Sequence, residues 1–267
     1  MHRYREGMSA TTIGGRVVPM DGAGRLRRTN LLMGLLHLAQ GVAVLLLANG
    51  FVLPVTASFL EGPPGTEPGA PEALFDLGVA EGVAVFLFLL ALAHLLIAGP
   101  LFDRYARDLE RNRNVFRWIE YSLSASVMIV LIAMLTGISD VAALIALFGV
   151  NASMILFGLV QERYEEPGGG ILPFWLGCIA GAVPWIAIAV YLASPGNDAS
   201  PPGFVYGIFV SLFLFFNAFA LNMWLQYRRV GRWRDYLYGE RVYVLLSLTA
   251  KSALAWQVFA GTLAGNA

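Results

Sequence analysis

The sequence predicts an all-α membrane protein built as a bundle of seven transmembrane helices. Of its 267 residues, 57% are hydrophobic and 13% are charged, which is about half the charged fraction of a typical soluble domain. The apolar residues fall into seven runs of roughly 20 residues, the length that crosses about 30 Å of hydrocarbon. The arginines lie in alternate connections between these runs. Together these observations predict both the fold class and the number of spans.

The seven predicted spans are separated by residues that end helices and form turns. The spans cover residues 27–49, 77–101, 114–137, 141–161, 171–193, 203–227 and 239–263. Asn49-Gly50, Gly99-Pro100 and Pro167-Gly168 fall at or beyond their ends. We expect one domain over residues 1–267, with a tail at 1–26 and a long outer loop at 50–76. The first 25 residues lack the apolar run of a cleavable signal peptide, so the first helix is expected to direct insertion.

All 17 arginines lie on one side of this predicted topology. They occur at positions 3–28, 104–117, 163 and 228–241. The loops after the first, third and fifth spans contain none, and neither does the C-terminus. Positively charged residues that flank membrane helices are retained in the cytoplasm. The distribution therefore predicts a multi-pass protein of the cell membrane with a cytoplasmic N-terminus and an extracellular C-terminus.

The only lysine, Lys251, lies near the middle of the last span. A charged amine in hydrocarbon is costly, so a lysine at this depth indicates a functional site. It is ten residues past Arg241, and its stem is too short to reach either interface. A lysine amine condenses with an aldehyde to form a Schiff base. One buried lysine in the seventh helix of a membrane protein therefore suggests covalently bound retinal.

Three further polar residues share the depth of Lys251. Counted at about 1.5 Å per residue, His37, His94 and Glu120 lie roughly 10–15 Å below the cytoplasmic face, as does the lysine. This common depth on four helices predicts one polar site in the cytoplasmic half of the bundle. Glu120 is either the anion that stabilises a protonated Schiff base or an interfacial partner of Arg117 at i,i+3.

Two features beside this pair are open to more than one interpretation. Ser247 lies one turn before Lys251 and either hydrogen-bonds within the site or bonds back to its own helix. His37 and His94, with Gln40 one turn from His37, are interpreted as a polar, water-holding pocket. A proton relay is a further interpretation of the two histidines. In the simplest alternative they satisfy each other or backbone carbonyls.

A bound retinal also requires an apolar, aromatic slot. Candidates at helical spacing are Tyr121, Ala125 and Met128 in the third span, Asn151, Met154 and Gly158 in the fourth, Phe209, Phe213 and Phe216 in the sixth, and Trp256 beyond the lysine. Such stripes are also typical of ordinary core. The single cysteine, Cys178, is interpreted as packing. Gly177 and Gly181 form a GxxxG motif, which indicates close helix contact either inside the bundle or across a dimer.

The predicted orientation, with the N-terminus in the cytoplasm, and two local motifs resemble the heliorhodopsin family. The third span contains RWIEYSLSASVM at 117–128, and the last contains SLTAK at 247–251. The likeness covers essentially the whole chain. It implies all-trans retinal on Lys251, Glu120 as the counterion, Ser247 bonded nearby, a homodimer and a β-hairpin in the outer loop. Among the candidate slot residues it favours Tyr121, Met128, Met154 and Phe216.

The sequence favours a light sensor over an ion pump. A pump needs proton donors and acceptors connected to both aqueous phases, but the outer half of the last span offers only Ser252, Gln257 and Thr262 as polar side chains. The resemblance implies a photoreceptor that signals by a shape change to a cytoplasmic or membrane partner. A light-driven or light-gated ion transporter is the alternative, and a retinal-free scaffold or enzyme is a third. We expect no enzyme activity, metal site or nucleic-acid partner.

Overall fold

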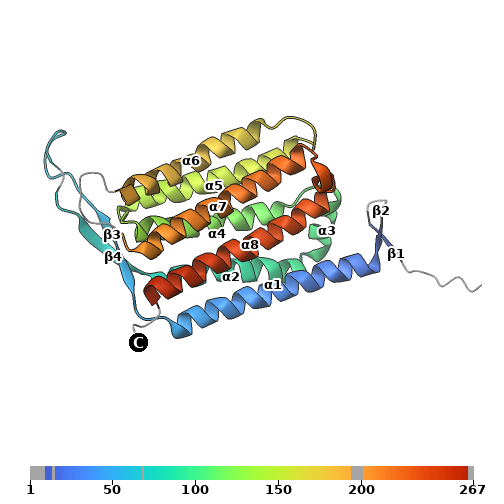
Figure 1. Cartoon of the computed structure of the whole chain (residues 1–267), viewed down its shortest axis with the longest axis horizontal. Helices are drawn as coiled ribbons and strands as arrows, with labels where there is room; N and C mark the ends of the chain where they lie inside the picture. Colours follow the sequence, from blue (N-terminus) through green and yellow to red (C-terminus); the bar gives the residue numbers. More distant parts are fainter. Residues whose placement is uncertain (1–9, 14–15, 68, 194–200, 264–267) are drawn as a thin grey trace, which may run out of the picture.

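A computed structural model describes residues 10–13, 16–67, 69–193 and 201–263 and forms a bundle of helices that run side by side (Figure 1). Within these residues, seven helices are long and apolar enough to cross a membrane. The elements are β1 (Ala10–Ile13), β2 (Arg16–Pro19), α1 (Met20–Leu47), β3 (Val52–Ala57), β4 (Glu72–Gly78), α2 (Val79–Ala98), α3 (Phe102–Glu110), α4 (Val115–Leu135), α5 (Val141–Tyr164), α6 (Leu172–Ala193), α7 (Gly203–Tyr227), η1 (Gly231–Arg234), α8 (Tyr236–Val258) and η2 (Phe259–Leu263). The predicted fold class and its seven spans are confirmed.

The short helix α3 was not expected in the connection between the second and third spans. Phe102, Tyr105 and Leu109 recur at helical spacing, and all three are buried together in a small cluster. Charged residues such as Arg104 and Arg107 occupy the exposed positions between them. An amphipathic pattern of this kind folds as a helix lying against the end of the bundle.

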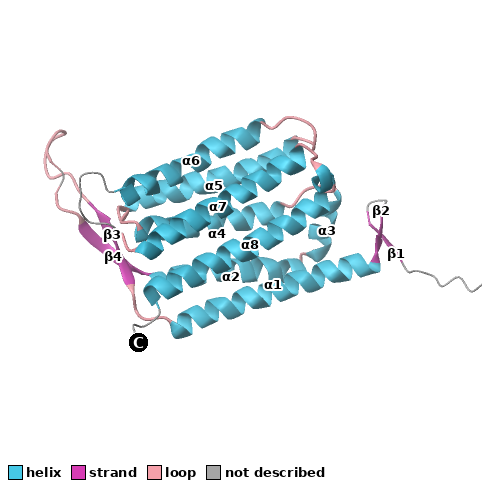
Figure 2. Ribbon diagram, in the orientation of Figure 1, coloured by secondary structure: helices cyan, strands magenta, loops and turns pink. Residues whose placement is uncertain are grey.

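The structure contains two β-hairpins, both outside the helix bundle (Figure 2). Strands β3 and β4 pair antiparallel, with Val52 opposite Gly78 and an irregularity between Val55 and Thr56. This hairpin agrees with the one expected in the loop at 50–76. Strands β1 and β2 pair within the predicted tail, whose first nine residues lie outside the described residues. Helix α1 begins at Met20, so its first residues belong to the predicted tail.

Hairpin β3–β4 is tied to the turn between α4 and α5. The backbone N–H of Thr56 donates to the carbonyl of Ser139 at 2.8 Å, and the two side-chain hydroxyls lie 2.9 Å apart. Asp140 caps the next helix by accepting from the N–H groups of Ala142 and Ala143. The hairpin therefore covers the end of the bundle opposite α3 (Figure 1).

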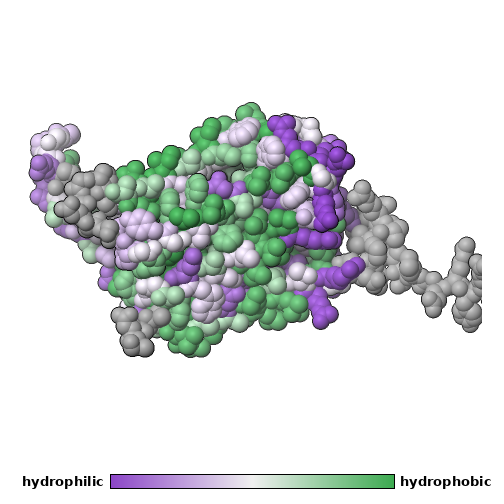
Figure 3. Space-filling view, viewed as in Figure 1, coloured by the Kyte–Doolittle hydropathy of each residue, from purple (hydrophilic) through white to green (hydrophobic). Residues whose placement is uncertain are grey.

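The two ends of the bundle differ in polarity. The main apolar core includes Val55 of the hairpin together with Ile138, Leu192, Val205 and Val258, so it fills the hairpin end. Strongly hydrophilic residues gather at the end where α3 lies and also at the tip of hairpin β3–β4, while the sides between are mostly hydrophobic (Figure 3). A band of this kind is what hydrocarbon requires of a spanning bundle. The functional polar groups are therefore expected towards the α3 end.

Candidate functional site

Lys251 and Glu120 form an ion pair inside the bundle. Nζ of Lys251 on α8 lies 2.8 Å from Oε1 of Glu120 on α4. Lys251 is 3% exposed, and its Nζ lies 4.5 Å from the centre of the Tyr121 ring. Opposite charges at this depth stabilise each other, because neither has water to replace its partner. Of the two possible partners of Glu120, the structure pairs it with Lys251. Arg117 pairs with other carboxylates instead.

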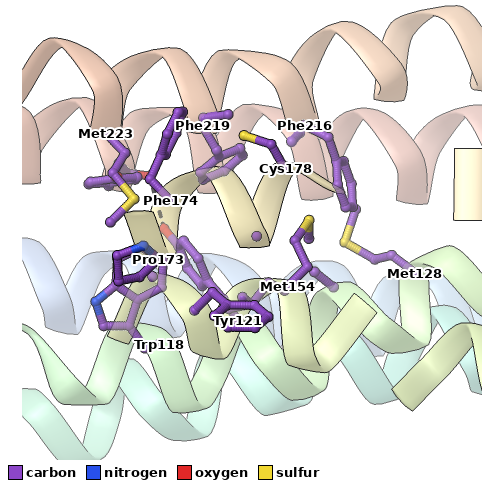
Figure 4. Close-up of a pocket in the computed structure, with 18 of the residues that line it drawn as sticks. Trp118, Tyr121, Met128, Met154, Pro173, Phe174, Cys178, Phe216, Phe219 and Met223 are labelled. Carbon is purple, nitrogen blue, oxygen red and sulfur yellow. Dashed lines mark hydrogen bonds between the residues drawn. The ribbon is translucent and has the colours of Figure 1, made fainter. Parts of the chain in front are cut away.

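An apolar cavity extends from Lys251 between α4, α5, α6 and α7 (Figure 4). Its volume is about 130 Å³, roughly ten times the cavity volume that one water molecule needs. Trp118 and Pro173 lie at one end and Met128 and Phe216 at the other. Because Trp118 and Met128 are ten residues apart on one helix, the cavity is about 15 Å long. It is an elongated apolar slot with one amine, that of Lys251, in its wall.

Most of the predicted slot residues line this cavity. They are Tyr121, Ala125, Met128, Met154, Gly158 and Phe216. Gly158 has a clear role, because a Cβ atom there would lie 2.3 Å from the Trp118 ring. The missing side chain lets the indole pack directly against α5. The structure therefore brings candidates from three helices to one cavity.

Four other predicted residues lie outside the cavity: Asn151, Phe209, Phe213 and Trp256. Asn151 donates a hydrogen bond to Oγ of Ser126, so it joins two helices instead. Phe213 is 40% exposed and packs edge-on against Trp185, with ring centres 5.4 Å apart. Trp256 is also 40% exposed. It follows the lysine by five residues, which turns it about 140° away around the helix.

The sequence did not predict many of the residues that line the cavity, including most of those on α6 and α7. The additional lining residues are Trp118, Ile155, Phe157, Pro173, Phe174, Gly177, Cys178, Phe219, Ala220, Met223, Tyr243 and Ala250. Cys178, interpreted as packing, is half-buried and faces this space. A signal for α7 was present in the sequence, since Phe219 and Met223 continue the stripe of Phe216 at helical spacing.

A second, polar cavity of about 40 Å³ lies on the α3 side of Glu120. Its polar lining residues are Asn30, His94, Tyr105, Asn114, Arg117, Glu120, Tyr121, Glu240 and Ser247. This volume holds about three waters. Ser247 is buried and faces this space beside Glu120. Burial raises the pKa of the Tyr105 phenol, so this group stays neutral at physiological pH.

The two histidines lie against each other at the edge of this polar cavity. Their rings stack with centres 5.9 Å apart and planes 13° from parallel. Nδ1 of His94 lies 2.8 Å from Oδ1 of Asn30, a geometry in which the ring nitrogen donates. His37 and Gln40 are both buried nearby on α1. The structure thus groups these residues as expected, whereas a relay role stays a prediction.

Arg117 forms the centre of a buried network that the sequence analysis missed. It makes ion pairs with Glu162 of α5 and Glu240 of α8. Its guanidinium also lies 3.9 Å from the centre of the Tyr243 ring. Arg117, Glu162 and Glu240 each lie within a few residues of a helix end, where charged residues ordinarily face water. Nothing in their sequence positions distinguishes a buried network from an interfacial one.

The GxxxG motif packs inside the chain. Gly177 and Gly181 are buried on α6, and Cβ atoms placed there would meet Met154 and Phe157 of α5. Of the two alternatives, the structure therefore has close contact within the bundle. The expected homodimer receives no support from this motif and stays a prediction.

Comparison with known proteins identifies the family. A family model described as Heliorhodopsin matches residues 26–263. A search of curated proteins gave no match. The matched region contains every described helix from α2 onwards, both cavities and the Lys251–Glu120 pair. The chain belongs to the heliorhodopsin family and is a retinal-binding, light-sensing rhodopsin that crosses the membrane several times.

Proposed function

We propose that Lys251 binds all-trans retinal as a protonated Schiff base, with Glu120 as its counterion. The observation that supports this proposal is the ion pair of 2.8 Å, whose lysine lies in the wall of the apolar cavity and whose glutamate lies in the wall of the polar one. Lys251 is also the only lysine in the chain. A buried amine next to one carboxylate is placed both to form the linkage and to keep its nitrogen charged.

The residues of the cavity fit an apolar polyene. Bound retinal supplies the absorption of light and the isomerisation that follows. Tyr121, Met128 and Phe216 offer aromatic and thioether surfaces along the slot. Glu120 holds the proton on the Lys251 nitrogen by charge, and Ser247 lies close enough to share the polar cavity with it.

We propose signalling, and not ion transport, as the use of this light response. The buried core of the hairpin half is largely apolar, with Ile129, Ile188, Leu212 and Leu254 almost fully enclosed. Polar cavity space lies on the other side of the Lys251–Glu120 pair. An ion would find few polar partners in the apolar half, so crossing it is costly. Movement of the helices at the α3 end is the simpler output.

We further propose that the α3 end faces the cytoplasm. The arginine distribution supports this orientation, since α3 and η1 both lie at that end and both carry arginines (Figure 1). The signalling partner is then a cytoplasmic or membrane protein that contacts this end. The homodimer belongs to the same proposal.

The attachment is tested by absorption spectra of the purified protein after all-trans retinal is added. We expect a visible band in the wild type and none in Lys251→Ala. Thr249→Ala is the matched control, because Thr249 is exposed on the same helix and its hydroxyl bonds back to Leu245. A visible band that persists in a folded Lys251→Ala protein contradicts the proposal.

The transport alternative is tested separately in sealed vesicles. Illumination should produce no sustained pH or voltage change across the membrane, with or without an ionophore that removes the opposing gradient. A steady light-driven change that the ionophore alters in the expected direction favours the transporter.

A further inference from the structure

The Arg117 network contains more negative than positive charge. Two carboxylates, Glu162 and Glu240, contact one guanidinium, and the three side chains are between 3% and 7% exposed. If both carboxylates were ionised, one negative charge would be buried without a counterpart. Such a charge is strongly unfavourable, and a buried group ordinarily takes up a proton instead.

Among the residues that the structure describes, the groups around the network do not supply the missing positive charge. The titratable and charged side chains that face the network or the adjoining polar cavity are Tyr105 of α3, Glu120 and Tyr121 of α4, Tyr227 of α7, Tyr236 and Tyr243 of α8, and His94 of α2. The charge of Lys251 is balanced by Glu120. His94 donates to a neutral amide oxygen, which does not require a charged ring.

The two carboxylates differ in how many donors they receive from the described residues. Glu162 accepts from the indole N–H of Trp118 at 2.6 Å, the backbone N–H of Asn114 at 3.0 Å and the hydroxyl of Tyr236 at 3.2 Å. Glu240 accepts from the side-chain amide of Asn114 at 2.8 Å. Several N–H and O–H donors stabilise a carboxylate and disfavour its protonated form. Glu240, with one such donor, is therefore the member whose negative charge the network stabilises least.

We propose that Glu240 is a protonated carboxylic acid at neutral pH and exchanges its proton with Glu120 through the polar cavity. Both carboxyl groups line that cavity, which has room for about three waters. In the transfer, an O–H bond of Glu240 breaks and an O–H bond forms on Glu120. One negative charge moves in the opposite direction, so the Arg117 network then holds the unpaired charge, and the transfer lasts only while the Lys251–Glu120 pair is disturbed.

The protonation of Glu240 and the exchange of its proton with Glu120 rest on different observations. The protonation of Glu240 follows from the charge count and the hydrogen bonds of the network alone. The exchange with Glu120 rests on the proposed function, because Glu120 needs a proton only when its ion pair with Lys251 is disturbed. Light is then the event that draws the proton from Glu240.

The protonation of Glu240 is tested by infrared spectroscopy in the dark, on the protein without retinal. A buried acid has a C=O stretching band that ionised carboxylates lack, and exchange into D₂O shifts it. We expect this band in wild type and in Glu120→Gln, and its loss in Glu240→Gln. Absence of the band in wild type, or its survival in Glu240→Gln, overturns the proposal. Because the protein carries no retinal in this measurement, the result stands apart from the attachment.

Thermal unfolding of matched variants gives a second readout. Glu240→Gln imitates the neutral acid, so its melting temperature should stay within about 3 °C of wild type, a change of roughly 1 kcal/mol or less. Glu162→Gln should melt distinctly lower and lose the band as well, since Glu240 must then ionise to balance Arg117. Equal destabilisation by the two substitutions overturns the assignment of the proton to Glu240.

The exchange is tested by light-minus-dark infrared difference spectra of the pigment. We expect a negative C=O band from Glu240 and a positive one from Glu120, with both absent in Glu240→Gln. The pigment of Glu240→Gln should still show its visible band. A light spectrum in which the Glu240 band is unchanged overturns the exchange while leaving the dark protonation intact.

Discussion

At the scale of single residues, the site depends on charges that are balanced in pairs or small groups. Lys251 and Glu120 were predictable, because a lone lysine and a carboxylate deep in spans are rare and costly. The pairing of Arg117 with Glu162 and Glu240 was not predictable. It needs three helix ends to meet, and the order in which seven helices pack is not contained in the residue pattern of any one of them.

The counterion role of Glu120 leads to a prediction about colour and pH. Glu120→Gln removes the negative charge next to the Lys251 nitrogen, so the proton of the linkage should leave at a pH lower by more than about one unit. The pigment should then absorb in the ultraviolet near neutral pH. If chloride takes the place of the carboxylate, the band should instead move strongly to the red. A pH titration of the absorption spectrum measures both outcomes.

His37→Ala and His94→Ala are the controls for this experiment, since neutral imidazole cannot balance a cation. Each should shift the band only modestly. A Glu120→Gln pigment with unchanged colour and unchanged titration would remove Glu120 from the counterion role.

At the scale of elements, helices and strands follow from patterns that differ in strength. Long apolar runs predicted the spans to within a few residues, and Phe102, Tyr105 and Leu109 contained a readable signal for α3. Which faces of α6 and α7 line the cavity was harder to predict, because both helices are apolar almost all round. The lipid-facing and cavity-facing sides then look alike in sequence.

The contact between α5 and α6 gives a prediction about stability. Gly177→Leu places a side chain where even an added Cβ would lie 3.2 Å from the carbonyl oxygen of Met154 and from Cβ of Phe157. Overpacking of this kind costs about 1–3 kcal/mol, so the melting temperature should fall by several degrees. Gly149→Leu on α5 is the control, because a Cβ there has no atom within 4 Å. Equal melting temperatures for the two variants would show that the contact is looser than described.

At the scale of the whole molecule, the bundle separates an apolar half from a polar half. The polar cavity, the Arg117 network and α3 all lie towards one end, and hairpin β3–β4 covers the other (Figures 1 and 3). The arginines reflect the same division in the sequence. Polarity along the membrane axis was therefore predictable from the loops, whereas the cavities depend on packing between helices.

This division predicts the orientation of the chain. The N-terminus should be cytoplasmic and the C-terminus extracellular, because every arginine lies in the N-terminal tail or in the connections on that side. Epitope tags at the two ends, probed on intact and permeabilised cells, distinguish the orientations. Surface labelling of an N-terminal tag on intact cells would mean that the chain is inserted the other way round.

The central claim is that retinal is bound covalently to Lys251 beside Glu120. Reduction of the pigment with borohydride, followed by proteolysis and mass spectrometry, tests it most directly. Reduction makes the bond permanent, and Lys251 is the only lysine side chain that can form it. We predict that the added mass of a reduced retinyl group appears on the peptide containing Lys251 and nowhere else. A coloured protein whose Lys251 peptide is recovered unmodified after reduction would contradict the account.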